Sequence, residues 1–186
     1  MTWTETREDT NRQLCQTELR ALDDLSHAVS EIGDWDSQSS GSFAKFFRDK
    51  FRLLLSEAWI RDFMLIPLPR NRSSAVNFIA DAVLALKDCE CGFEHQIRVE
   101  ISFDNRQIIG TNVLKMLVSG DLIGDDNACK NLGVLICASK EAKKTFGLDP
   151  AVGSSDEYLL AIENGYASII SMPIFLGVIR GSSLAG

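Results

Sequence analysis

Two apolar runs separated by a helical pattern constrain the fold of this chain most. Residues 132–138 read LGVLICA and residues 173–179 read PIFLGVI. Continuous apolar runs of this length are typical of strands that are buried on both faces. Between them, residues 155–164 begin at a Ser or Asp suited to a helix N-terminus and end before Gly165, which favours a helix. The strand–helix–strand order predicts an α/β layer with parallel neighbouring strands.

A third strand is predicted at residues 97–103, which read IRVEISF. Side chains alternate along a strand, so Arg98, Glu100 and Ser102 share one face and the apolar residues share the other. An edge strand with a solvated polar face is the commoner origin of such alternation. The other reading is a strand that presents the Glu100 carboxylate to a divalent metal ion, as in many metal-dependent nucleases.

The rest of the chain is predicted to be more helical before residue 60 than after it. We expect an α/β fold with a central mixed β-sheet flanked by helices and a helical N-terminal part. Residues 1–186 are expected to form a single domain, with an N-terminal helix and linker at 1–41 and the core at 42–180. The expected helices are 6–32, 43–59, 108–118 and 139–146, the expected short strand is 63–68, and 75–86 is either helix or strand.

Composition limits where the chain acts. No apolar run approaches the roughly 20 residues of a membrane span, and the N-terminus has no signal-peptide core. Five cysteines without a repeating frame suggest a reducing compartment, so we expect a cytoplasmic protein without membrane contact. The net charge of −7 argues against non-specific attraction to phosphates. Basic residues gather between Lys45 and Arg52, where the usual interpretation is a solvated helix face.

Standard motif searches are mostly negative and leave acidic residues as the main candidates for a functional site. The chain has no phosphate-binding glycine-rich loop and only two histidines. Cys89 and Cys91 form a C-x-C pair, but no second pair has zinc-ligand spacing, so buried or half-buried free thiols are expected. The acids that lie within one short segment are Asp88, Glu90, Glu94 and Glu100. Two of them on adjacent strands could hold a magnesium ion through oxygen ligands.

The segment RVEISFDNRQ resembles the catalytic strand of the BamHI, BglII and BstYI group of type II restriction endonucleases, whose pattern is V-E-V-Q-F-G-N/K-Y. This group belongs to the PD-(D/E)XK nuclease superfamily. Three further segments resemble a helix and two strands of the same group, in the same order and with similar spacing. They are FAKFFRDKFRLLLSEAWI, KNLGVLICAS and SMPIFLGVI, and the resemblance covers about residues 42–179.

The chain departs from the group's pattern at its active-site positions. Ser102 stands where the family has Gln or Glu, and Asn131 stands where it has an Asp. The family's first Asp falls on Cys91 without a gap. Asp88 or Glu90 takes that place only if the hairpin before the strand is one to three residues longer.

The resemblance implies a restriction-endonuclease-like fold and hydrolysis of double-stranded DNA with magnesium (Mg2+). In that reading Glu100 and Asp88 or Glu90 bind the metal, and Ser102 orients the attacking water. A two-fold homodimer and a cognate methyltransferase acting on the same site are the implied partners. Two other readings stay open: an inactive DNA-binding or regulatory protein on the same fold, and an unrelated α/β binding protein.

Overall fold

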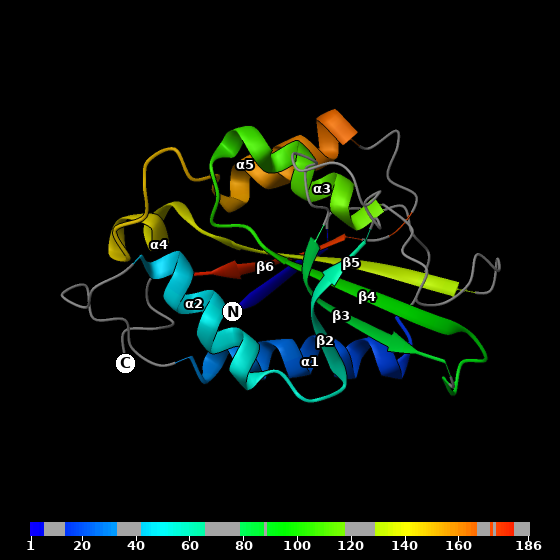
Figure 1. Cartoon of the computed structure of the whole chain (residues 1–186). Coiled ribbons are helices and arrows are strands. Elements are labelled where there is room, and N and C mark those ends of the chain that lie inside the picture. Colours follow the sequence, from blue (N-terminus) through cyan, green and yellow to red (C-terminus); the bar gives the residue numbers. More distant parts are fainter. Residues whose placement is uncertain are drawn as a thin grey trace, which may run out of the picture.

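The centre of the protein is a six-stranded sheet with helices on both faces (Figure 1). The computed structural model describes residues 1–5, 14–32, 42–65, 79–87, 89–117, 129–166, 172 and 174–180. The strands are β1 (Thr2–Glu5), β2 (Trp59–Met64), β3 (Ile79–Leu86), β4 (Glu94–Ile101), β5 (Cys129–Ala138) and β6 (Ile174–Ile179). The α-helices are α1 (Gln16–Ser30), α2 (Phe43–Leu54), α3 (Ile109–Leu117), α4 (Lys140–Thr145) and α5 (Ser155–Leu160). A 3₁₀ turn, η1 (Arg106–Ile108), precedes α3, and a π-helical segment, η2 (Ala161–Tyr166), follows α5.

The sheet is mixed, with the strand order β1-β6-β5-β4-β3-β2. Strands β4, β5 and β6 run parallel to their neighbours in this group, whereas the β1–β6, β2–β3 and β3–β4 pairs are antiparallel. The three runs predicted as strands are therefore neighbours in one sheet. This confirms the prediction of an α/β fold with a central mixed sheet flanked by helices.

Each face of the sheet has its own apolar layer (Figure 1). Helices α1 and α2 cover one face, where Leu25 and Phe47 are fully buried. Helices α3 and α5 cover the other face, where Val113 and Tyr158 are fully buried. The alternating side chains of the strands supply both layers, which is why the central strands are apolar or buried on both sides.

The edge-strand interpretation of residues 97–103 is wrong. Strand β4 lies between β3 and β5, and the exposed fractions of Arg98, Glu100 and Ser102 are 1%, 3% and 0%. Helix α3 covers this face closely, since a Cβ on Gly133 of β5 would lie 3.1 Å from the Cβ of Met116. The polar residues of β4 thus face a covered interior, where a polar group is costly unless it is bonded.

Several element boundaries differ from the predictions. The helix expected at 43–59 ends at Leu54, and Trp59 instead begins β2, ahead of the strand expected at 63–68. Trp59 is buried, and its Nε1 donates to Asp24 of α1 at 3.1 Å, which accounts for the early turn of the chain. The segment 75–86 was ambiguous between helix and strand; its residues 79–86 form strand β3, and residues 75–78 lie outside the described residues. The short polar strand β1 was not predicted.

None of the helices in the described ranges is both long enough and apolar enough to cross a membrane.

Candidate functional site

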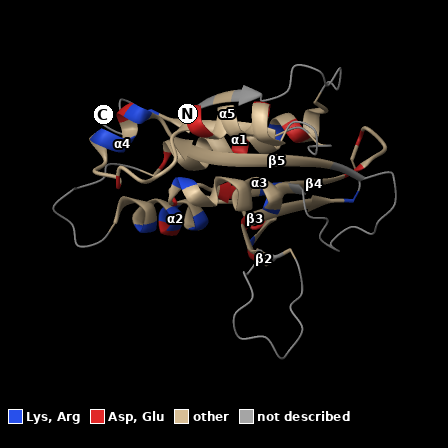
Figure 2. Ribbon diagram, turned by 90° about the horizontal axis from the view of Figure 1, so that it is seen from above, with Lys and Arg blue, Asp and Glu red and all other residues tan. Residues whose placement is uncertain are grey.

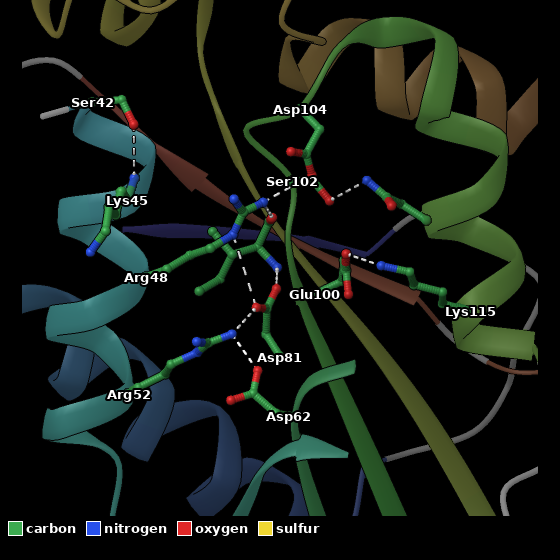
Figure 3. Close-up of polar contacts among 12 residues, drawn as sticks. Ser42, Lys45, Arg48, Arg52, Asp62, Asp81, Glu100, Ser102, Asp104 and Lys115 are labelled. Carbon is green, nitrogen blue, oxygen red and sulfur yellow. Dashed lines mark hydrogen bonds and ion pairs between the residues drawn. The ribbon is translucent and has the colours of Figure 1, made fainter. Parts of the chain in front are cut away.

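Glu100 lies near the carboxyl end of β4, on the face covered by α3. Its side chain is 4% exposed, and its Oε1 accepts a hydrogen bond from Lys115 Nζ of α3 at 2.6 Å (Figure 3). Its Oε2 is buried and has no hydrogen-bond partner among the residues that the structure describes. A buried carboxylate oxygen without a donor is uncommon, because losing hydration without replacing it costs free energy.

The surroundings of Glu100 oppose its negative charge. The pKa of Glu100 is raised to about 7 from an ordinary value of 4.5, chiefly by burial and then by the neighbouring charge of Asp81. Lys115 and Arg48 act in the opposite direction and lower the pKa, but they do not cancel the effect of burial. A carboxylate held in this way gains from a further positive charge at its free oxygen.

Asp81 on β3 is the acid that the fold sets beside Glu100. Ala82 pairs with Val99 in the antiparallel ladder, so Asp81 and Glu100 are the next residues along their strands, and the charge of Asp81 raises the pKa of Glu100. The Asp81 carboxylate is bonded to α2, whereas the Glu100 carboxylate is bonded to α3 on the other face of the sheet. The Asp81 side chain is 10% exposed. Its Oδ2 accepts from the backbone N–H of Ile101 at 2.8 Å, which ties the carboxylate to the end of β4.

Two arginines of α2 reach this end of the sheet (Figure 3). Arg52 Nη2 donates to Oδ1 of Asp81 at 3.1 Å, and Arg48 Nε lies 3.9 Å from the same oxygen. Arg48 Nη2 also donates to the carbonyl of Ile101 and to Asp104 Oδ2, both at 2.9 Å. Helix α2 is therefore fastened to the ends of β3 and β4 by charged contacts. The interpretation of its basic residues as a merely solvated face does not hold for these two.

Asp62 on β2 lies at the border of the site in a strained backbone conformation. It is an ion-pair partner of Arg52, and its φ of 51° falls in the left-handed region that residues other than glycine rarely adopt. Such residues occur often at functional sites, where the surrounding structure holds them in place.

Ser102 belongs to a buried polar network rather than to the carboxylate pair. Asn112 of α3 donates through Nδ2 to Ser102 Oγ at 3.3 Å and to the Tyr158 hydroxyl at 3.1 Å. Burial raises the pKa of Tyr158 to about 12, so this hydroxyl stays protonated at neutral pH. The Oδ1 atom of Asn112 has no partner within the described ranges. The network fixes α3 and α5 against the end of β4.

The other acids predicted from the sequence lie elsewhere or outside the described residues. Glu90 is in the turn that precedes β4, at the opposite end of the strand from Glu100. Its side chain is 77% exposed, and its Oε1 lies 4.0 Å from Arg20 Nη1. Glu94 is half-buried at the first position of β4. Asp88 lies outside the described residues.

Sequence reasoning missed Asp81 and Lys115. Asp81 lies in the apolar run IADAVLAL, which was ambiguous between helix and strand. The pairing of this run with the Glu100 strand therefore could not be predicted from the sequence. The signal that could have found it is its charge: an isolated acid in an apolar strand calls for a partner. Lys115 is one basic residue of an amphipathic helix, and only the packing of α3 directs it to Glu100.

A cavity of about 330 Å³ lies apart from these residues, beside β6, α4 and α5. Ser139, Asp156 and Arg180 are among its lining residues, and the carboxylate pair is not. The side chain of Asp156 is 66% exposed and is paired with Lys140 at 2.8 Å. This cavity therefore lacks the buried, incompletely bonded acid that distinguishes the end of β4.

No model of a known protein family matches the chain, and no curated protein matches it in sequence.

Proposed function

We propose that this chain is a magnesium-dependent nuclease that hydrolyses phosphodiester bonds of double-stranded DNA, with Asp81, Glu100 and Lys115 at its active site. The observation that carries the proposal is the buried Oε2 of Glu100, which has no hydrogen-bond partner among the described residues and lies near a second buried acid, Asp81. Asp81 takes the role that the resemblance assigned to Asp88 or Glu90.

The arrangement of the segments that carry the family resemblance supports this proposal. The segments on β4, β5 and β6 are neighbours in the sheet, and the segment on α2 packs on one face of it. A restriction-endonuclease-like fold is therefore part of the proposal.

The donor set fits magnesium, which prefers carboxylate oxygens. Asp81 and Glu100 would hold the ion, and Oε2 of Glu100 is an oxygen without a hydrogen-bond partner within the described ranges. When bound, magnesium polarises a phosphate and lowers the pKa of a coordinated water.

The neighbouring side chains have separate roles in this proposal. Arg48 and Arg52 orient the Asp81 carboxylate from α2. Lys115 compensates the charge of Glu100 and brings a cation to the point where a phosphate must approach. Ser102, which is fully buried and bonded to Asn112, positions the end of β4 and does not meet substrate.

Lys and Arg residues recur along helix α2, with an acidic residue among them (Figure 2). Four basic residues and one acidic residue lie between Lys45 and Arg52. The side chain of Lys45 is 74% exposed, whereas those of Arg48 and Arg52 are 25% and 30% exposed. Lys45 is paired with Asp49, Arg48 with Asp104, and Arg52 with Asp62 and Asp81, so carboxylates offset much of the positive charge of this helix. In the proposal, the phosphates of DNA compete with these carboxylates for the basic side chains.

The experiment that tests the proposal is digestion of unmethylated phage DNA by the purified full chain, with and without Mg2+. The proposal predicts discrete fragments with magnesium and intact DNA without it. A parallel binding assay on duplex DNA in magnesium-free buffer separates the alternatives. Binding without cleavage in magnesium or manganese would favour an inactive protein, and absence of both would favour an unrelated α/β binding protein.

An inactive DNA-binding or regulatory protein on the same fold is the second candidate. This candidate is favoured because three of the four carboxylate oxygens of Asp81 and Glu100 already accept hydrogen bonds. Both oxygens of Asp81 and one of Glu100 are bonded to other groups of the chain. In this reading Lys115 permanently replaces the metal ion.

A two-fold homodimer is the assembly that goes with cleavage of a symmetric site. Sedimentation with and without duplex DNA tests this part of the proposal. A chain that stays monomeric at micromolar concentration in both conditions would contradict it.

A further inference from the structure

Three cysteines and a histidine meet at the other end of β4. Cys15 is the residue that precedes α1, Cys89 and Cys91 lie in the turn between β3 and β4, and His95 is on β4. Their potential ligand atoms all lie within 4.8 Å of one another. The cluster brings together two parts of the chain that are 74 residues apart in the sequence.

The separations within the cluster are close to those of a four-coordinate metal site. The Cys15 and Cys89 sulfurs are 3.9 Å apart, and Nε2 of His95 lies 3.5 Å from the Cys15 sulfur and 2.9 Å from the Cys91 sulfur. Zinc bonds of about 2.3 Å to sulfur and 2.0 Å to nitrogen give tetrahedral edges of roughly 3.5–3.8 Å. The closest sulfur pair, Cys89 and Cys91, is 3.0 Å apart, whereas a disulfide bond is about 2.05 Å long.

The turn before β4 directs donors toward the Cys89 sulfur. Gly92 adopts a φ of 74°, which closes the turn through a hydrogen bond from its N–H to the carbonyl of Cys89 at 2.9 Å. The N–H of Cys91 lies 3.5 Å from the Cys89 sulfur, and Thr17 Oγ1 lies 3.1 Å from it. Such donors stabilise a thiolate, which is the form that binds metal.

His95 is oriented for coordination by a buried carboxylate. Its Nδ1 lies 3.2 Å from Glu18 Oε1, and the two side chains are 0% and 1% exposed. The other oxygen of Glu18 accepts from the N–H of Cys15 at 3.0 Å. A carboxylate on one ring nitrogen fixes the tautomer and leaves the other nitrogen for a metal ion. Here that other nitrogen, Nε2, faces the sulfurs.

We propose that Cys15, Cys89, Cys91 and His95 form a structural zinc site. Three thiolates and an imidazole suit zinc and not magnesium, which takes oxygen ligands. Four protein ligands close the coordination shell, so the ion fastens the start of α1 to the β3–β4 hairpin and takes no part in hydrolysis. This inference replaces the expectation of free thiols, and it does not depend on the proposed nuclease function.

The test is the metal content of the full chain, expressed in zinc-supplemented medium and purified without a polyhistidine tag. We expect about one zinc per chain by atomic emission, and Cys89→Ser is expected to lose it. Cys137→Ser is the matched control, because Cys137 is a buried cysteine of β5 outside the cluster. Zinc-free wild type with a Cys89–Cys91 disulfide by mass spectrometry would overturn the proposal, as would unchanged zinc content in Cys89→Ser.

A second measurement covers the case in which Cys89→Ser fails to fold. Cobalt substituted into the wild type is expected to give thiolate-to-cobalt charge-transfer absorption and the intense visible bands of tetrahedral Co²⁺. Glu18→Gln is expected to weaken zinc binding about 10- to 100-fold, because it removes the carboxylate behind His95. Weak octahedral cobalt bands in the wild type, or an unchanged zinc affinity in Glu18→Gln, would contradict the site.

Discussion

Strand β4 carries His95 near its first residue and Glu100 near its last, and the two side chains lie on opposite faces of the sheet. At the His95 end, the neighbouring groups are sulfurs, and the histidine is bonded to Glu18. At the Glu100 end, the neighbouring groups are a second carboxylate and basic residues, and one oxygen of Glu100 has no partner in the described part of the chain.

In the two proposals, one strand serves two kinds of ion. Soft sulfur ligands that surround a point completely favour an ion that stays bound and stabilises the fold. Oxygen ligands that are partly engaged and lie beside positive side chains favour an ion that exchanges and meets phosphate. We therefore propose that the ion at the first end stabilises the fold and that the ion at the second end takes part in hydrolysis.

The largest expected effect separates the two ends by stability. Removing zinc with a zinc-selective chelator is expected to lower the melting temperature by at least about 10 °C, the equivalent of roughly 4 kcal/mol for a chain of this size. Omitting magnesium is expected to change it by less than about 2 °C. Calorimetry measures both changes. Equal shifts in melting temperature would contradict the assignment of a structural ion to one end of β4 and a catalytic ion to the other.

The next effect is the dependence of stability on pH at the Glu100 end. Because the pKa of Glu100 is raised to about 7 from 4.5, the folded state holds this proton more tightly than the unfolded state. Its contribution to stability is complete below pH 4.5 and is lost as the pH rises to about 7, by about 3 kcal/mol at most. Urea unfolding of magnesium-free Glu100→Gln between pH 5 and 7.5 should therefore lack this decline. A decline as steep as that of the wild type would assign it to other groups.

A third prediction distinguishes Asp81 from the acid at the opposite end of β4. Asp81→Asn is expected to slow magnesium-dependent DNA cleavage by at least about a hundredfold, or roughly 2.7 kcal/mol in the barrier, because the amide is a poorer metal ligand. Glu90→Gln is expected to change the rate less than about twofold, since its side chain is exposed. The reverse pattern would indicate that Glu90, and not Asp81, is the second metal ligand.

The smallest expected effect concerns Ser102. Ser102→Ala removes an acceptor from Asn112 and is expected to lower the free energy of unfolding by about 1 kcal/mol. Cleavage is expected to change less than about fivefold, because the hydroxyl is buried in a network with α3 and α5. A loss comparable to that of Asp81→Asn would show that Ser102 acts on the reacting groups.

The sheet was predictable where burial alone determines the pattern. Strand β5 contains the whole apolar run 132–138 and begins three residues before it, and β6 lies within the run 173–179. Strands that are buried on both faces need apolar side chains, so these runs could be recognised. The polar face of β4 could not be read in the same way. Alternation looks the same for a solvated edge and for a buried central strand, and only the packing of α3 decides between them.

The candidate sites were predictable only in part, because they too depend on how distant segments pack together. Glu100 was found because its motif is local, whereas its neighbour Asp81 depends on the register of the β3–β4 pair. The sequence shows the C-x-C pair of Cys89 and Cys91, but no second pair with the spacing of zinc ligands. Cys15, a further ligand of the proposed zinc site, lies far from this pair in the sequence and approaches it only in the folded chain. A motif search based on local spacing therefore could not include Cys15.

The most direct measurement of the central claim is the rate of DNA cleavage by Glu100→Gln beside Glu94→Gln, each in saturating magnesium. The two variants remove one negative charge from the same strand and the same face, roughly 20 Å apart along β4. We predict that Glu100→Gln abolishes cleavage while keeping its fold and its magnesium-free DNA binding, and that Glu94→Gln cleaves like the wild type. Equal cleavage by Glu100→Gln and the wild type would contradict it.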